Sequence, residues 1–331
     1  MSVQITPNFV VKFEDRLQYL IEDSWARVLP RLHWDRLMTV RPSSSRKEII
    51  SWMLHMAGIK PLEQGGSLPL EDIVETSHEI ENEDFGDALE ITRNDFEDAD
   101  GKGIDRGAQW AKHIGGHGAY WPQEGLYALI AQGETQKSYD GVPFFSAQHP
   151  INPVIGAGAG TYPNLFTNAA LTPANFAKAV AAVKRLVKRP DGKSRFLVPS
   201  ILVAPTELED TALTILTAQF LGRDGSSTDN VLRRYGFGEP IIPHELASPT
   251  EWYLGCEVVG EELPAFIYQE RRAFELNTFS HLDHADLHVM KKFRWTYDGR
   301  NMVAYGHPFL FFKFKASGPG LSLTDLTTIV S

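Results

Sequence analysis

The chain has 331 residues, which predicts about two domains, and its 43% hydrophobic content is enough to bury a core, so wholesale disorder is excluded. Lysine plus arginine number 32 and aspartate plus glutamate 42, a net charge of −10, which disfavours tight nucleic-acid binding but is compatible with enclosing DNA. No apolar run reaches the roughly 20 residues that span a bilayer, and the first residues lack the apolar core of a secretory signal. We therefore expect a soluble chain without a membrane partner.

The chain has a single cysteine, Cys256. One cysteine excludes a disulfide within the chain and a zinc site of several cysteines. Its surroundings, EWYLGCEVV, predict a small hydrophobic residue in a strand.

Residues 1–40 predict an arm with one amphipathic helix. Apolar residues recur at partly helical spacing from Phe13 to Leu29, and Pro30 ends the helix. The many aromatic residues of this arm need a surface to pack on, either the body of the same chain or a neighbour.

Residues 41–92 predict a long two-way excursion. The stretches 76–80 and 88–93 alternate like strands, and each leg of about 20 to 25 residues can extend tens of ångströms. A loop of this length is usually functional or disordered, and its aromatic content argues against disorder.

Residues 94–133 predict a helix in two pieces. Asn94 or Asp95 caps the first piece, and Pro122 fits the first turn of the second. Several glycines in the first piece cost up to about 1 kcal/mol each, so tertiary contacts must hold it.

From residue 171 the pattern alternates between helix and strand. Thr172 and Pro173 predict a helix start, residues 196–204 a buried strand, and Thr206 with Glu209 a capping box. The remaining signals are a turn at Asp298–Gly299, short strands, and a terminal extension: 241–244, 251–256, 264–269, 287–295, 309–315 and 316–331.

Two groups of histidines have residue types that could bind a metal. His113 and His117 share a helix face, but the glycine-rich HIGGHG stretch and the absence of HExxH argue against a metal. His281, Asp283 and His284 are a richer set of ligand types, although a solvated turn entering a strand is the simpler interpretation.

No other motif predicts chemistry. The glycine run 156–160 lacks the preceding strand and following helix of a dinucleotide loop, and the chain has no GxxxxGK[ST] or GxSxG. The acidic cluster at 94–100 is more typical of a charged helix start than of a cation site. We therefore expect no catalytic residue, cofactor or metal, and no enzyme.

Several motifs in order resemble the Mu-like phage major head subunit (gpT) family. They are HEIENEDFGDALEITRNDFED (78–98), YDGVPFFSAQHP (139–150), Pro42-Ser43-Ser44 with Trp52, and the helix WPQEGLYALI (121–130). Gly86 and Asp87 replace a glutamate-containing step of the family pattern. The resemblance is strongest over 40–150, and beyond 170 it depends on the order of elements.

The resemblance implies an α+β Hong Kong 97-type phage capsid fold. Its parts are an N-terminal arm, an extended E-loop, a peripheral domain with a long spine helix, an axial domain, return strands of the peripheral domain and a C-terminal tail: 1–40, 41–92, 93–195, 196–275, 276–315 and 316–331. It also implies that the spine-helix glycines allow bending and close packing.

The implied function is that of a major capsid protein. Copies assemble into pentamers and hexamers of an icosahedral head that encloses double-stranded DNA without sequence-specific binding. The implied partners are other copies, with scaffold, portal and decoration proteins as further candidates, and the implied location is the virion, with assembly in the host cytoplasm. Because buried aromatic residues dominate interface energies, we expect five intersubunit contacts: Phe13, Trp25, Trp52, Met53 and Phe85.

Two alternatives remain open from the sequence. One is a metal-dependent enzyme that uses His281, Asp283 and His284, with His113 as a further ligand. The other is a tail or sheath structural protein of a phage.

Overall fold

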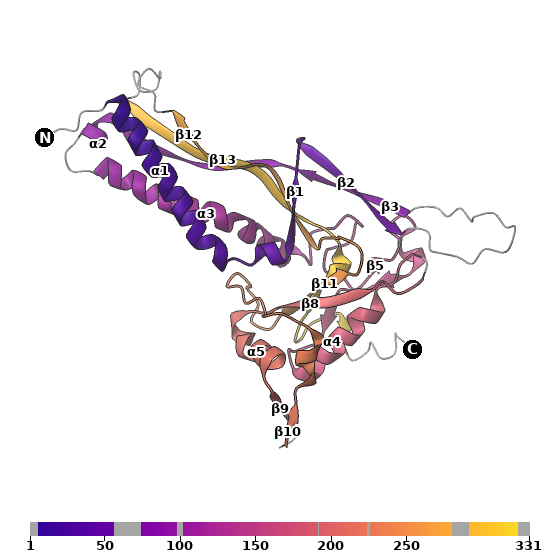
Figure 1. Cartoon of the computed structure of the whole chain (residues 1–331). Coiled ribbons are helices and arrows are strands. Elements are labelled where there is room, and N and C mark those ends of the chain that lie inside the picture. Colours follow the sequence, from indigo (N-terminus) through magenta and orange to yellow (C-terminus); the bar gives the residue numbers. More distant parts are fainter. Residues whose placement is uncertain are drawn as a thin grey trace.

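A computed structural model describes residues 6–55, 74–97, 102–190, 192–223, 226–279 and 291–323. Figure 1 shows an elongated upper body of helices and long strands, a hairpin that leaves one end of it, and a second body below. The α-helices are α1 (Pro7–Val28), α2 (Arg93–Glu97), α3 (Lys102–Gln132), α4 (Pro173–Leu186) and α5 (Glu209–Thr217).

The strands are β1 (Met38–Pro42), β2 (Lys47–His55), β3 (Val74–Glu81), β4 (Glu83–Thr92), β5 (His149–Pro150), β6 (Thr161–Tyr162), β7 (Leu165–Thr167), β8 (Leu197–Val203), β9 (Phe220–Arg223), β10 (Ser226–Asp229), β11 (Trp252–Val258), β12 (Phe266–Phe279), β13 (Lys292–Tyr305), β14 (Phe311–Phe314) and β15 (Leu321–Ser322). Short 3₁₀ turns connect them: η1 (Leu29–Arg31), η2 (Trp34–Arg36), η3 (Gly156–Ala159), η4 (Thr206–Leu208), η5 (Val231–Tyr235) and η6 (Pro308–Leu310).

The upper body is a four-stranded sheet in the order β1-β12-β13-β4, with α1 and α3 packed along it. Strand β1 runs parallel to β12, and the other two pairings are antiparallel. The apolar faces of α1, α3, β4 and β13 form one core between the helices and the sheet. This arrangement confirms the α+β fold with a long spine helix, α3.

Helix α1 confirms the predicted helix of the arm and begins earlier than expected. The Thr6 hydroxyl caps it by accepting a 3.3 Å hydrogen bond from the Phe9 amide, and Pro7 occupies the first turn. Its buried side chains recur at helical spacing: Val10, Phe13, Leu17 and Ile21.

Helix α3 corrects the prediction of two pieces. Its 31 residues are continuous, with Pro122 inside. Proline removes one backbone donor and disfavours a helix interior, but neighbouring side chains hold this segment on both sides. The Trp121 indole donates to Asn301 Oδ1 at 2.9 Å, and the Tyr120 hydroxyl donates to Glu245 at 2.7 Å. Tertiary packing therefore overrides the local signal.

Strand β13 corrects a second prediction, because Asp298–Gly299 lies inside it rather than in a turn. The pairing with β12 is irregular opposite this dipeptide, between Glu270 and Glu275. A Cβ at Gly299 would stand 2.9 Å from the Phe274 ring, so the glycine allows the two strands to approach at this irregularity.

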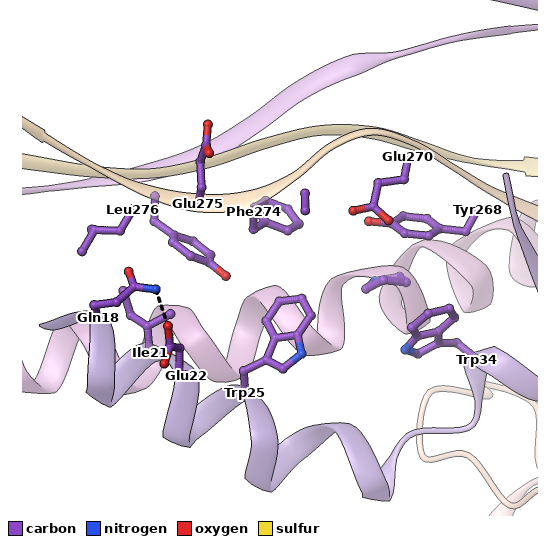
Figure 2. A pocket seen from close by; sticks show the side chains of 13 residues that line it. Gln18, Ile21, Glu22, Trp25, Trp34, Tyr268, Glu270, Phe274, Glu275 and Leu276 are labelled. Carbon is purple, nitrogen blue, oxygen red and sulfur yellow. Dashed lines mark hydrogen bonds between the residues drawn. The ribbon is translucent and has the colours of Figure 1, made fainter. Parts of the chain in front are cut away.

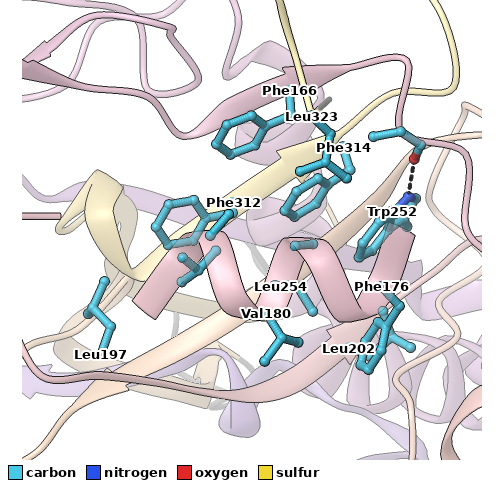
Figure 3. Packing of buried hydrophobic residues seen from close by; sticks show 14 of the residues in the cluster. Phe166, Phe176, Val180, Leu197, Leu202, Trp252, Leu254, Phe312, Phe314 and Leu323 are labelled. Atoms are coloured by element: carbon cyan, nitrogen blue, oxygen red, sulfur yellow. Dashed lines mark hydrogen bonds between the residues drawn. The ribbon is translucent and has the colours of Figure 1, made fainter. Parts of the chain in front are cut away.

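The lower body is a five-stranded sheet in the order β15-β7-β14-β11-β8, covered by α4. Figure 3 shows the aromatic core beneath α4, where Trp252 stacks on Phe314 at 4.2 Å between ring centroids. The Trp252 indole donates to the Ala169 carbonyl at 2.7 Å, which satisfies its buried N–H. Helix α4 and strand β8 confirm the helix predicted from Thr172 and the buried strand predicted at 196–204.

Two smaller predictions for the lower body are wrong. Residues 241–244 form no strand and contribute a single bridge between Ile241 and Val203. The capping box at Thr206 is absent, because a 3₁₀ turn precedes α5 and the Thr206 hydroxyl bonds Glu207 instead.

One shared core joins the two bodies, with side chains from α3, β11, β12 and the 144–145 segment. Strand β4, in the second half of the predicted excursion, belongs to the upper sheet. The division of the chain into six segments stays a prediction. Among the described residues, no helix is long and apolar enough to cross a membrane.

Candidate assembly surfaces

The β2–β3 hairpin projects from the end of the upper body (Figure 1). The strands pair antiparallel from Lys47 opposite Glu81 to His55 opposite Val74. The amide of Asn82 donates to the Arg46 carbonyl at 2.9 Å, so the two legs meet at their root. The connecting residues 56–73 lie outside the described part of the chain.

One face of the hairpin is apolar and docks on the same chain. The Trp52 side chain is only 5% exposed, and its ring centroid lies 4.4 Å from that of His307 and 5.6 Å from that of Tyr139. Ile80 and Ile267 complete this small core. Burial, with the nearby charges of Arg195, Arg41 and His78, lowers the pKa of His307 to about 3.

A buried amide pair fixes the same root. The Asn82 side chain is 3% exposed and donates to Ser43 Oγ at 2.8 Å and to the Ser45 carbonyl at 2.9 Å. Gln269 of β12 in turn donates to Asn82 Oδ1 at 2.9 Å and to the Ile80 carbonyl at 3.3 Å. Buried amides satisfied in this way favour one geometry, so they hold the direction in which the hairpin leaves the sheet.

The turn that enters β2 is tied to one carboxylate. Glu48 accepts hydrogen bonds from the Ser43 hydroxyl at 3.0 Å and from the backbone amides of Ser44 at 2.7 Å and Ser45 at 2.9 Å. These bonds lower the pKa of Glu48 to about 2. The carboxylate therefore stays charged and keeps the turn closed across the physiological range.

The other face of the hairpin is exposed. Ile49 is 68% exposed, and Lys47 pairs with Glu79 and with Glu81 at the surface. An exposed apolar residue on a projecting strand is a candidate contact with another molecule.

Helix α1 lies against α3 at a line of glycines. A Cβ at Gly115 would stand 2.8 Å from the Cα of Ile21, and one at Gly118 would stand 3.1 Å from the Trp25 ring. The glycines therefore allow the two helix backbones to approach closely. The close packing predicted for them is present, whereas a change of bend stays a prediction.

A groove of about 300 Å³ opens between α1 and the sheet (Figure 2). Trp25 and Trp34 lie on its helix side, and Tyr268 and Phe274 lie on its sheet side. Aromatic and aliphatic side chains line most of this groove, together with three carboxylates: Glu22, Glu270 and Glu275.

The structure places the five predicted contact residues in different surroundings. Phe13 is 4% exposed and packs against Phe96 and Trp295 in its own chain, and Trp52 is buried as described. Trp25 and Phe85 are half-buried, in the groove and against the Trp121 ring respectively. The side chain of Met53 is not among the parts that the structure describes. Their role between subunits stays a prediction.

The structure describes one of the two predicted histidine sites, the pair on α3. His113 and His117 stack with ring centroids 6.2 Å apart on the exposed side of α3, and His117 contacts Glu124 at 3.3 Å. Within the described residues, no group of three or more histidine, cysteine, aspartate or glutamate side chains is placed to hold a metal. His281, Asp283 and His284 lie outside the described residues.

Sequence reasoning missed a buried histidine–aspartate pair in the 139–150 segment. His149 Nδ1 lies 2.6 Å from Asp140 Oδ2, with both side chains almost fully buried, and Asn164 contacts the other ring nitrogen at 3.1 Å. It also missed Asn82 and Gln269. For Gln269 the available signal was a polar residue directly after the apolar run Phe266–Tyr268, whereas the stretches around Asn82 and His149 are polar and carry no such signal.

Comparisons with known proteins agree with this architecture. Residues 22–167 match the family of the Mu-like prophage major head subunit gpT, and residues 127–297, more than half of the chain, match the phage capsid protein family. The major capsid protein of Escherichia phage Mu is 32% identical over 127 residues, which are 38% of this chain. The match spans 40% of the length of that relative.

Solved capsids share the fold at low identity. The procapsid protein of bacteriophage JBD30 superimposes with a TM-score of 0.50 at 17% identity, covering 98% of this chain and 80% of that one. The capsid protein of cyanophage P-SCSP1u gives a TM-score of 0.53 at 13% identity, covering 86% and 87%. These likenesses show the Hong Kong 97-type fold. The chain therefore belongs to the phage capsid protein family, with its first half matching the Mu-like major head subunit gpT.

Proposed function

We propose that this chain is the major capsid protein of a Mu-like tailed phage, and that copies of it assemble into the pentamers and hexamers of an icosahedral head. Closed symmetric rings of one subunit build such a shell, and many weak contacts act together once a subunit is in the lattice. The head encloses double-stranded DNA, and the chain has no catalytic role. It works in the virion after assembly in the host cytoplasm, with scaffold, portal and decoration proteins as further partners.

One observation carries the proposal: the β2–β3 hairpin projects from a body that is otherwise well packed (Figure 1). Asn82 fixes its root and Trp52 docks one face further along, while Ile49 is exposed on the opposite face. A fixed root and an exposed apolar face suit a hairpin that contacts another subunit. Family membership and the capsid fold support the same conclusion.

Electron microscopy of the purified full-length chain tests the proposal directly. Closed shells are the expected product. Tubes would instead indicate a tail or sheath protein, and a chain that stays monomeric with stoichiometric zinc or iron would indicate a metal enzyme.

Removal of the hairpin is the sharper test. Deletion of 46–88 would also remove part of β4, which pairs with β13 in the upper sheet. Deletion of 47–81, closed by a short glycine-serine linker, spares that strand because Arg46 and Asn82 already lie side by side. We expect a folded chain that forms no shells, and normal particles would contradict the role of the hairpin in assembly.

A matched pair of point variants separates assembly from folding. Ile49 on the hairpin is 68% exposed and Val154 on the loop after β5 is 72% exposed, so aspartate at either position disturbs no core. We expect Ile49→Asp to abolish shells and Val154→Asp to keep them, with equal thermal unfolding temperatures. If both variants form shells equally well, the exposed face of the hairpin has no role in assembly.

A further inference from the structure

Positive charge is concentrated in one segment of this acidic chain. Residues 141–206 contain a single acidic residue, Asp191, and seven basic residues: Lys178, Lys184, Arg185, Lys188, Arg189, Lys193 and Arg195. Because the whole chain carries 32 basic and 42 acidic residues, the remainder holds 25 and 41. A net charge of +6 in this segment is therefore set against −16 elsewhere.

Three of these seven basic residues lie on the exposed side of α4, and Lys188 follows the helix. The inner face of the helix packs into the core of the lower body through Phe176 and Val180 (Figure 3), and Val183 belongs to the same core. Lys178 and Arg185 lie seven residues apart on the exposed face, which spans about 10 Å of helix axis. No acidic residue occurs anywhere in α4.

The basic surface continues beyond the helix. Lys184 and Lys188 are exposed beside it, and Lys184 Nζ lies 5.8 Å from the Tyr235 ring centroid. This contact places η5 next to α4, so the exposed Arg233 and Arg234 of η5 extend the basic surface. Arg234 has a carboxylate nearby, Asp229 at 3.5 Å, but both side chains are well exposed, so the pair is weak.

Stabilisation of the helix end explains only part of this pattern. Lys184 and Arg185 lie in the last turn of α4, where cations interact favourably with the helix dipole. Lys178 lies further toward the start, and Lys188 follows the helix. Among the described residues, no carboxylate lies within 4.0 Å of Lys178, Lys184, Arg185 or Lys188. Like charges so arranged repel one another until a polyanion approaches.

We propose that the outer face of α4, with Lys188 and the neighbouring arginines of η5, binds the phosphate backbone of the nucleic acid that the shell encloses. The inference depends on the proposed capsid function. Flexible lysines bind phosphates as point charges and read no bases, so the contact is independent of sequence. Duplex DNA carries one charge per about 1.7 Å of axis, so it offers several phosphates to a basic row about 10 Å long. The acidic remainder of the chain keeps DNA from adsorbing elsewhere.

Salt-dependent DNA binding tests the surface. The test variant is Lys178→Gln, Lys184→Gln, Arg185→Gln and Lys188→Gln combined. The control carries the same change in charge at four exposed cations elsewhere: Lys12, Arg16, Lys112 and Lys137, each to Gln. Binding of a fluorescein-labelled 20-base-pair duplex to the unassembled full-length chain is followed by fluorescence anisotropy from 50 to 200 mM NaCl.

Four phosphate contacts weaken binding about 10²-fold over this range, a slope of about −3.6 in log K against log salt. We expect the control to keep the slope of the unaltered chain and the test variant to lose about 3.6 of it, since only Arg233 and Arg234 of the surface remain. Equal slopes in the two variants would overturn the proposal. Tighter binding of polyglutamate than of the duplex would also overturn it, in favour of an acidic protein partner. If the fourfold variant does not fold, Lys178→Gln with Lys188→Gln is expected to remove about half of the slope.

Assembled shells separate this inference from the capsid function. Both variants are expected to form shells as the unaltered chain does, because neither changes the hairpin. Closed empty shells of the unaltered chain are expected to leave added duplex unbound, since the proposal places the basic surface on the inside of the shell. Duplex bound to closed shells of the unaltered chain, but not to those of the test variant, would place the surface outside and overturn the contact with the enclosed genome.

Discussion

The indole ring of Trp52 lies against the imidazole of His307, with 4.4 Å between the ring centroids. Trp52 belongs to the projecting hairpin, and His307 follows the last long strand of the upper sheet. Both side chains are buried, so this contact between distant parts of the chain attaches the hairpin to the body.

Replacement of Trp52 by alanine should loosen the hairpin. Replacement of a buried tryptophan by alanine typically lowers the free energy of unfolding by about 3–5 kcal/mol. Trp52 packs against His307 and Tyr139 and belongs to the same small core as Ile80. Denaturant unfolding measures the loss, and hydrogen exchange of the β2 and β3 amides should accelerate first. Ile49→Ala, on the exposed face, is the control and should change neither. Unchanged exchange in the Trp52 variant would contradict the attachment.

Stability should fall in mild acid because of His307. The unfolded chain takes up a proton near pH 6.5, whereas burial keeps the folded imidazole neutral down to about pH 3. Protons therefore bind preferentially to the unfolded state between these values, and stability falls by at most about 1.4 kcal/mol per pH unit in that window. His78, whose pKa is also lowered by burial, adds to the same trend.

The pH dependence can be assigned with two variants. Between pH 7 and 5 the stability of His307→Gln should depend on pH less than that of the unaltered chain. His113→Gln removes an exposed imidazole and should leave the slope as it was. Glu48 contributes only as the pH falls from about 4.5 toward 2, since its lowered pKa stabilises the folded chain above that range. Identical slopes for all three chains would show that His307 does not set the acid sensitivity.

Adjacent glycines of α3 should respond in opposite ways to alanine. At Gly115 a Cβ would stand 2.8 Å from the Cα of Ile21, so Gly115→Ala must push α1 and α3 apart and destabilise the chain by about 1–3 kcal/mol. At Gly116 the nearest atom is Ser24 Oγ at 3.2 Å, which can move. Gly116→Ala should be neutral or gain up to about 1 kcal/mol of helix propensity. Thermal unfolding of both variants checks the contrast, and equal effects would contradict the close approach of the two helices.

The buried pair of Asp140 and His149 should contribute far more to the free energy of unfolding than a surface pair does. The 2.6 Å contact is shielded from water, so Asp140→Ala should cost about 1–3 kcal/mol by leaving a buried hydrogen-bonding group without its partner. Lys47→Ala removes a solvent-exposed pair with Glu79 and should lower the free energy of unfolding far less. A double-mutant cycle with His149→Ala measures the coupling, and strictly additive losses would show that the two side chains act independently.

The local pattern of the sequence determined those elements whose signals are local. The apolar spacing of α1, the Thr172–Pro173 start of α4 and the apolar run of β8 each predicted the element found there. The motifs of 78–98 and 139–150 pointed to the capsid family and its fold. These features depend on neighbours a few residues apart, so they can be read along the chain.

Only the tertiary structure decided features that join distant residues. Pro122 continues a helix because packing with other elements offsets its missing donor, and Asp298–Gly299 continues a strand because β12 accommodates it. The Asn82–Gln269 bond spans 187 positions, and the Trp52–His307 contact spans still more of the chain. No local spacing encodes such pairs, because their partners meet only when the sheet forms and excludes water. The direction of the hairpin was therefore decided by the fold, although the sequence had already marked the segment as an excursion.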